Sequence, residues 1–235
     1  MGRVGKGMAT ATAINATSLR EQVYHYLRRA INRGDLTPGA HIDQNRVASE
    51  LGISRQPLRD ALIQLEAEGF VRILPRRGVV VRQLTLEDIR HLYEIIGALE
   101  GAAVVAVGAG LDLNRLTAMR SLTADMVRAI DEGDFERYYE LNVEFHETFL
   151  TLCDNADLVR TVRISKQLLY DFPRVAGFVP EWELRSTEEH AELVDLLEQG
   201  SIRSAGDYLR DVHWSFDVQQ RFVLQYYFGA VAGKR

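Results

Sequence analysis

The sequence predicts a mostly α-helical protein, in which an N-terminal winged helix-turn-helix with a small β-hairpin wing precedes a C-terminal antiparallel bundle of helices. Helical hydrophobic periods run through most of the 235 residues, and the β-rich segments lie together just before residue 82. The charge changes sign there, because residues 1–82 hold 13 Lys and Arg against 7 Asp and Glu, whereas residues 83–235 hold 15 against 26. We therefore expect a flexible tail over 1–17, a basic domain over 18–82 and an acidic helical domain over 83–235.

Three helices are expected in the basic domain. Ser18 and Glu21 form a capping box at the start of the first, which runs to Arg33. Asp43 caps a short second helix that Gly52 ends, and a third helix runs from about residue 54 to 68 with leucines on its inward face. Two short helices joined by a tight turn that contains Gly match the helix-turn-helix pattern.

A hairpin is expected after the third helix. Two β-rich runs lie at 70–74 and 79–81, and the basic turn between them predicts a wing with a basic tip. On the third helix, Arg55 or Gln56 and Arg59 lie three or four residues apart and share the face opposite the leucines. An apolar face can anchor such a helix while its polar groups reach base edges or phosphates in the major groove. The basic domain is therefore predicted to bind DNA.

The acidic domain is expected to contain helices only. Thr85 and Asp88 can cap its first helix, and Ser186 and Glu189 can cap a later one. Residues 97–110 are apolar nearly all round, so that helix is expected in the bundle core or at a dimer interface. Breaks at Gly, Asn and Pro divide the domain into six or so helices, expected at 86–109, 112–131, 134–153, 156–173, 184–199 and 202–228.

Three histidines of the acidic domain are candidates for a shared site. His146, His190 and His213 fall on separate predicted helices, and Asn142 lies four residues before His146 on the same helical face. Taken singly, a histidine is more often a hydrogen-bonded structural residue than a ligand, and spacing alone does not show convergence. A helical bundle could nevertheless bring all three imidazoles inward.

Residues 36–81, LTPGAHIDQNRVASELGISRQPLRDALIQLEAEGFVRILPRRGVVV, resemble the N-terminal domain of the GntR family of bacterial transcription regulators nearly throughout. The resemblance leaves Arg76 open, either as a DNA contact or as a solvated loop charge. It implies a recognition helix that starts at Gln56, and DNA contacts at Arg46, Arg55, Gln56, Arg59, Arg77 and Gly78.

Four motifs in the second half, YEIIGALE (93–100), LNVEFHETFLTLCDN (141–155), EEH (188–190) and DYLRDVH (207–213), resemble the all-helical effector domain (FCD type) of the FadR-like branch of that family. In many members of the branch, an Asp and three His bind a divalent metal ion. The resemblance implies a divalent metal ion with ligands at Asn142, His146, His190 and His213. Zinc or nickel is expected first, and copper and iron stay open because imidazole suits them as well.

The chain departs from that family pattern at two positions. Asn142 stands where Asp is usual, which removes a charged ligand and lowers the expected metal affinity, but leaves the ion more positive charge to attract an anionic ligand. Ile96 stands where the family often has an Arg that can hold a carboxylate. Recognition of an acidic effector would therefore depend more on the metal.

These features predict a transcription regulator, which we expect to be a repressor that binds a palindromic operator as a homodimer and senses a small organic acid. Two alternatives stay open: a regulator that responds to the metal itself, and a metal-dependent enzyme fused to a DNA-binding domain. No HExxH, GxSxG, GxxxxGK or GxGxxG motif supports an enzyme. No run approaches the roughly 18 apolar residues of a membrane helix, so a cytoplasmic protein without a membrane partner is expected.

Overall fold

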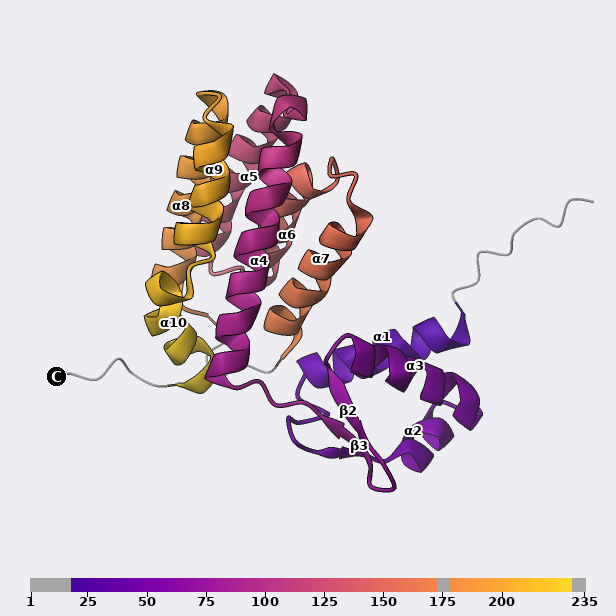
Figure 1. Cartoon of the computed structure of the whole chain (residues 1–235). Helices are drawn as coiled ribbons and strands as arrows, with labels where there is room; N and C mark the ends of the chain where they lie inside the picture. The colour runs from indigo at the N-terminus through magenta and orange to yellow at the C-terminus, as the bar shows by residue number, and fades with distance from the viewer. Residues whose placement is uncertain (1–17, 173–177, 230–235) are drawn as a thin grey trace, which may run out of the picture.

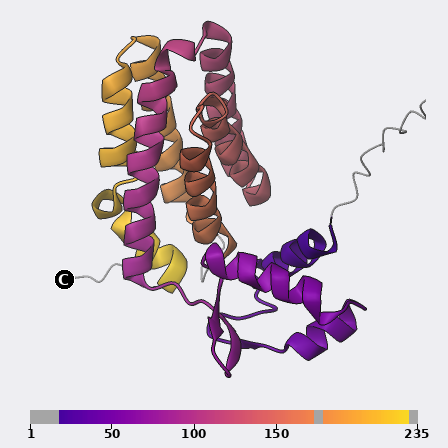
Figure 2. The same ribbon diagram turned by 45° about the vertical axis from the view of Figure 1, so that its right-hand side comes forward.

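The structure is a computed structural model that describes residues 18–172 and 178–229; the tail predicted over 1–17 lies outside the described residues. Within these ranges the chain forms a bundle of long helices and a smaller N-terminal domain that carries a short sheet (Figure 1). The same two parts are seen after rotation by 45° (Figure 2). The predicted fold class is confirmed.

The N-terminal domain consists of three helices and a three-stranded antiparallel sheet of order β1-β3-β2. The Ser18 and Asp43 side chains accept hydrogen bonds from backbone N–H groups in the first turns of the helices they precede, as predicted. Strand β1 is not among the predicted strands, because two residues are too few to show an alternating pattern. The elements are α1 (Leu19–Asn32), β1 (His41–Ile42), α2 (Gln44–Glu50), α3 (Arg55–Ala67), β2 (Val71–Leu74) and β3 (Gly78–Val81).

The C-terminal domain is an antiparallel helical bundle in which α4 is central. Helix α4 contacts α6, α7 and α9, and α5 packs against α6 and α8. Thr85 and Asp88 form the predicted capping box at the start of α4. The helices are α4 (Leu86–Val107), α5 (Leu113–Asp131), α6 (Phe135–Leu150), α7 (Ala156–Asp171), α8 (Pro180–Glu198), α9 (Ile202–Tyr208) and α10 (Phe216–Phe228).

Two predicted helix boundaries in this domain are wrong. Helix α8 begins at Pro180 and not at 184, because proline is well suited to the first helical position; Ser186 and Glu189 therefore lie inside the helix and do not cap it. The long helix predicted over 202–228 is interrupted by a π-helical turn at Leu209–His213, after which α10 starts. Residues 209–213 contain neither Gly nor Pro, so no helix-breaking residue marked this turn in the sequence.

The close packing of α4 explains the small residues between 97 and 110. A Cβ atom at Gly101 would lie 2.6 Å from the carbonyl oxygen of Gly206, so only glycine lets the backbones of α4 and α9 approach this closely. The same apolar stretch contains Glu100, whose side chain is completely buried. A buried carboxylate needs partners, and these lie in the candidate site.

The end of α7 packs against the N-terminal domain. Arg28 of α1 donates hydrogen bonds to Asp171, and Asn32 of α1 donates to the backbone oxygen of Tyr170 over 3.4 Å. The rings of Phe70 and Phe172 stack with their centroids 5.8 Å apart. The two domains are therefore joined by packed side chains as well as by the connection between β3 and α4.

Candidate functional site

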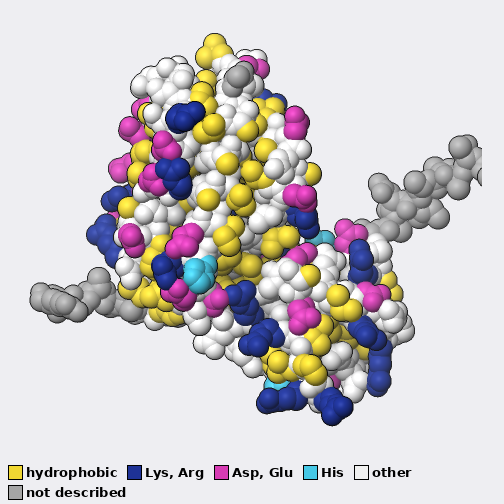
Figure 3. Space-filling view, in the orientation of Figure 1, with side chains coloured by type: hydrophobic (Ala, Val, Ile, Leu, Met, Phe, Trp, Pro, Cys, Tyr) yellow, Lys and Arg dark blue, Asp and Glu magenta, His cyan; other side chains and the backbone are white. Residues whose placement is uncertain are grey.

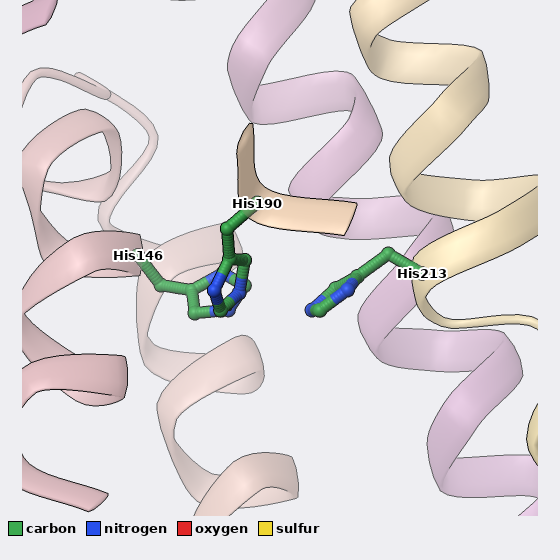
Figure 4. A group of neighbouring side chains, drawn as sticks. All are labelled: His146, His190 and His213. Atoms are coloured by element: carbon green, nitrogen blue, oxygen red, sulfur yellow. The ribbon is translucent and has the colours of Figure 1, made fainter. Parts of the chain in front are cut away.

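Three buried histidines converge in the middle of the bundle. His146 on α6, His190 on α8 and His213 in the π-helical turn point their rings toward one another (Figure 4). One ligand nitrogen from each lies within 4.8 Å of the others, and the Nε2 atoms of His146 and His190 are 3.3 Å apart. A tetrahedral zinc ion with Zn–N bonds of about 2.0 Å separates its ligand nitrogens by about 3.3 Å. The separation of His146 and His190 therefore fits a small divalent metal ion, and His213 lies near enough to complete the site.

Two buried carboxylates lie behind the triad. Nδ1 of His213 is 3.0 Å from Oε2 of Glu189, and Nδ1 of His146 is 2.8 Å from Oε2 of Glu100, although this second contact is poorly aligned for a hydrogen bond. Carboxylates in these positions favour a proton on Nδ1 and leave Nε2 as the ligand atom. Neither acid could be recognised from the sequence, because nothing local to them shows that they would face histidines on other helices.

Glu100 belongs to a buried charged cluster. Its carboxylate accepts hydrogen bonds from Lys166 Nζ at 2.9 Å and from Trp214 Nε1 at 2.7 Å. Burial alone would raise the pKa of Glu100, but His146 and Lys166 hold it well below its usual value. Burial also lowers the pKa of Lys166, which Glu100 partly offsets. The buried ion pair of Glu100 and Lys166 therefore lies directly behind the histidines, and its two charges balance each other.

Two of the three histidines, His146 and His190, are uncharged at neutral pH. Burial lowers the pKa of His146 to about 4 and the pKa of His190 well below its usual value. Neutral imidazoles carry the free nitrogen lone pair that a metal ion needs, so protons compete little for the site near pH 7. The donor set therefore fits a divalent zinc- or nickel-like ion in its chemistry as well as in its spacing.

Asn142 connects the triad to a cavity. It lies one turn before His146 on α6, is buried, and donates a hydrogen bond from Nδ2 to the hydroxyl of Tyr170 over 3.3 Å. Asn142 and His213 both line a cavity of about 450 Å³ that extends to Asn32 on α1. Among the described residues that line it, none is Lys or Arg. Ile96 is fully buried and is not part of this lining.

The candidate DNA-contact residues all lie on the surface of the N-terminal domain, where Lys and Arg gather at the end farthest from the bundle (Figure 3). Arg55 donates to Asn45 Oδ1 on α2 over 3.1 Å, a contact that the sequence analysis missed. Gly78 has a φ of +92°, which explains the glycine at the wing tip. The exposed set comprises Arg46, Arg55, Gln56, Arg59, Arg77 and Gly78.

Comparison with known families assigns both domains. The model described as "Bacterial regulatory proteins, gntR family" matches residues 19–81, and the model described as "FCD domain" matches residues 91–212. The chain belongs to the GntR family. This GntR-family protein is therefore a helix-turn-helix transcription regulator that binds DNA through its N-terminal domain and carries an FCD effector domain.

Relatives and solved structures agree with this assignment. A regulator from Agrobacterium vitis, named for the TAR-I ttuE-ttuC' intergenic region, is 34% identical over 54% of this chain and 76% of its own length. The transcriptional repressor RspR of Escherichia coli is 26% identical over 63% of this chain and 65% of its own. The crystal structure of a GntR regulator from Rhodococcus sp. RHA1 is 25% identical, with a TM-score of 0.63, over 86% of this chain and 96% of its own.

The family assignment also bears on the enzyme alternative. The family and its named members are transcription regulators and not enzymes, which sets aside a metal-dependent enzyme fused to this DNA-binding domain. In the part of the chain that the structure describes, no helix has the length and apolar character needed to cross a bilayer.

Proposed function

We propose that this GntR-family protein is a repressor whose affinity for operator DNA falls when a small carboxylate binds a divalent metal ion in its FCD domain. The observation that carries the proposal is the convergence of three buried imidazoles beside a cavity that extends to the DNA-binding domain. Repression is supported by RspR, a relative that is named a transcriptional repressor.

The metal would be held by Nε2 of His146, His190 and His213, with Asn142 supplying an amide oxygen. When bound, the ion would supply a Lewis acid for an anionic oxygen of the effector. Imidazole and amide ligands add no negative charge, so the ion would keep its full charge, and the described cavity lining offers no Lys or Arg to hold a carboxylate. The cavity, about 450 Å³ in volume, has room for an organic molecule and so favours a ligand sensor over a response to the metal alone.

Operator binding would use the exposed residues of α2, α3 and the wing. Residues at the start of α3 would enter the major groove, and the wing tip would reach the adjacent backbone. One such domain gives a small interface, so we expect a homodimer on a palindromic operator, which doubles the contacts. The proposed contacts are Arg46, Arg55, Gln56, Arg59, Arg77 and Gly78.

The end of α7 is the proposed connection between effector and DNA. Tyr170 lines the cavity, and the next residue, Asp171, pairs with Arg28 of α1. Arg28 also donates to the hydroxyl of Tyr24, which in turn donates to Glu68 at the end of α3. A ligand that moved Tyr170 would thus change contacts that position α3. A coupling free energy of about 1–3 kcal/mol would change operator affinity about 5- to 150-fold.

Elemental analysis of the purified full-length protein tests the metal site. We expect about one equivalent of zinc or nickel per chain in the parent, and loss of the metal in both His146→Ala and His190→Ala. His91→Ala removes an exposed histidine of α4 and should retain the metal. A parent protein that binds no added zinc or nickel, or variants that keep it, would rule out this part of the proposal.

Operator titrations test the connection. The parent protein, loaded with zinc, should release operator DNA when a small carboxylate is added. Arg28→Gln should bind the operator with nearly unchanged affinity but respond several-fold less to the acid, because the contact with Asp171 is lost. An unchanged response in Arg28→Gln would exclude this route, and no response to any carboxylate in the parent would exclude the sensor.

A further inference from the structure

The cavity beside the histidines has an unusual lining. Nearly half of the residues that line it carry Phe, Tyr or Trp rings, whereas such residues make up only 9% of the chain. Among the described lining residues, Leu169 is the only large side chain that is apolar and not aromatic. The rings come from several helices and include Tyr93, Tyr139, Tyr170, Trp182, Trp214 and Tyr227.

These rings already interact edge to face. The centroids of Tyr139 and Tyr170 are 4.9 Å apart at an interplanar angle of 80°, and those of Tyr93 and Trp214 are 5.4 Å apart at 68°. In such pairs the positive edge of one ring meets the negative face of the other. A further flat ring can join this arrangement through the same edge-to-face contacts, whereas a small aliphatic acid cannot make them.

We propose that the effector is an aromatic acid, with its ring among these side chains and its carboxylate directed toward the histidines. The inference rests on the proposed function, since it names the class of carboxylate that the same cavity takes. Asn142 and His213 line this cavity together with the rings, so one molecule can reach both.

Four acidic side chains line the described part of the cavity and would attract a cation: Glu136, which is exposed, and Asp171, Glu183 and Glu189. Glu189 accepts hydrogen bonds from Arg185 and Gln219 and lies against His213, and Asp171 is held by Arg28. A cationic ligand would have to compete with these groups and would be repelled by a metal ion at the triad. An aromatic ammonium compound is therefore the alternative that the test must reject.

Both tryptophans of the chain line the cavity, so intrinsic fluorescence reports on ligand binding. The zinc-loaded full-length protein is titrated with benzoate, with cyclohexanecarboxylate, which has a saturated ring and the same charge, and with benzyltrimethylammonium. We expect benzoate to bind about tenfold more tightly than its saturated counterpart, since a ring pair adds affinity beyond buried area. Equal affinities, a preference for the ammonium compound, or no change in emission with benzoate at millimolar concentration would overturn the inference.

Substitutions at Tyr139 refine the test. Tyr139→Leu should reduce the preference for benzoate to about two- to threefold, whereas Tyr139→Phe, which keeps the ring, should retain most of it. Tyr26→Leu removes a half-buried tyrosine of α1 outside the cavity lining and should leave the preference unchanged. If Tyr139→Leu kept the full preference, the rings would not be its source.

Removal of zinc separates this inference from the proposed function. The absolute affinity for both acids should fall, because the carboxylate loses its anchor, while the ratio between them should persist. If benzoate and cyclohexanecarboxylate bound with equal affinity, and only in the presence of zinc, the aromatic preference would be overturned. The proposed function would then still stand. A preference for benzoate that persists, with absolute affinities that do not fall when zinc is removed, would support the aromatic site and contradict the metal anchor.

Discussion

The proposed DNA-contact surface and the proposed effector site use charged side chains in opposite ways. The arginines of the proposed DNA-contact set are exposed (Arg46, Arg55, Arg59 and Arg77), and Arg46 pairs locally with Glu50 one turn away at 3.2 Å. In the FCD domain, Glu100 and Lys166 are buried together although 66 residues separate them in sequence. An exposed charge stays hydrated and free to meet a phosphate, whereas a buried charge must be matched within the fold. Substitutions should therefore affect DNA affinity in the first region and stability in the second.

The largest effect is expected at Glu100. Glu100→Ala leaves the ammonium of Lys166 buried without its carboxylate and the indole N–H of Trp214 without its acceptor. Breaking a buried ion pair in this way costs about 3–5 kcal/mol. We expect the free energy of unfolding, measured by urea denaturation with circular dichroism, to fall by that amount.

Two further variants control this experiment. Glu94→Ala removes an exposed glutamate of the same helix and should change the free energy of unfolding by no more than about 0.5 kcal/mol. The double variant Glu100→Leu with Lys166→Leu should recover much of the lost stability, because no unpaired charge remains. If Glu100→Ala cost no more than Glu94→Ala, the contrast between the two regions would fail.

Arg59 tests the expectation that substitutions of exposed arginines change DNA affinity and not stability. Arg59→Ala should weaken operator binding by about 1–3 kcal/mol if the side chain reads a base, with the free energy of unfolding nearly unchanged because the side chain is exposed. Fluorescence anisotropy with labelled operator DNA measures the first quantity. Arg160→Ala, an exposed arginine of α7, should leave operator affinity unchanged. An equal loss on every DNA sequence would indicate a phosphate contact, and no loss would remove Arg59 from the interface.

The same difference explains how far the sequence could predict the structure. Helices α1 to α3, the wing and the exposed arginines follow from caps and spacings a few residues long. The three histidines were named from spacing and family resemblance. Their supporting carboxylates, Glu100 and Glu189, were missed, because 46 residues separate Glu100 from His146 and only packing brings them together. The packing of α7 on the N-terminal domain was missed for the same reason. Glu100 itself lies within the apolar stretch 97–110, where the pattern gave no sign of a buried charge.

The smallest effect is expected at the wing tip, where stability and DNA affinity should change in opposite directions. Arg76 has a φ of +61°, and the backbone N–H of Arg77 donates to the oxygen of Leu74 over 3.0 Å to close the turn. A non-glycine residue in the left-handed region costs roughly 1–2 kcal/mol. Arg76→Gly removes that cost but gives the unfolded chain more freedom, so we expect the free energy of unfolding to rise by at most about 1 kcal/mol.

Operator affinity should fall in the same variant, with the salt dependence of binding reduced by about one ion if Arg76 contacts a phosphate. Arg77→Gly is the matched control, because Arg77 has no positive φ: it should also weaken binding but should lower the free energy of unfolding slightly. Higher stability in Arg76→Gly together with unchanged operator affinity would show that Arg76 is only a solvated loop charge. Loss of affinity with a gain in stability would show that the wing keeps an unfavourable backbone conformation because its arginine binds DNA.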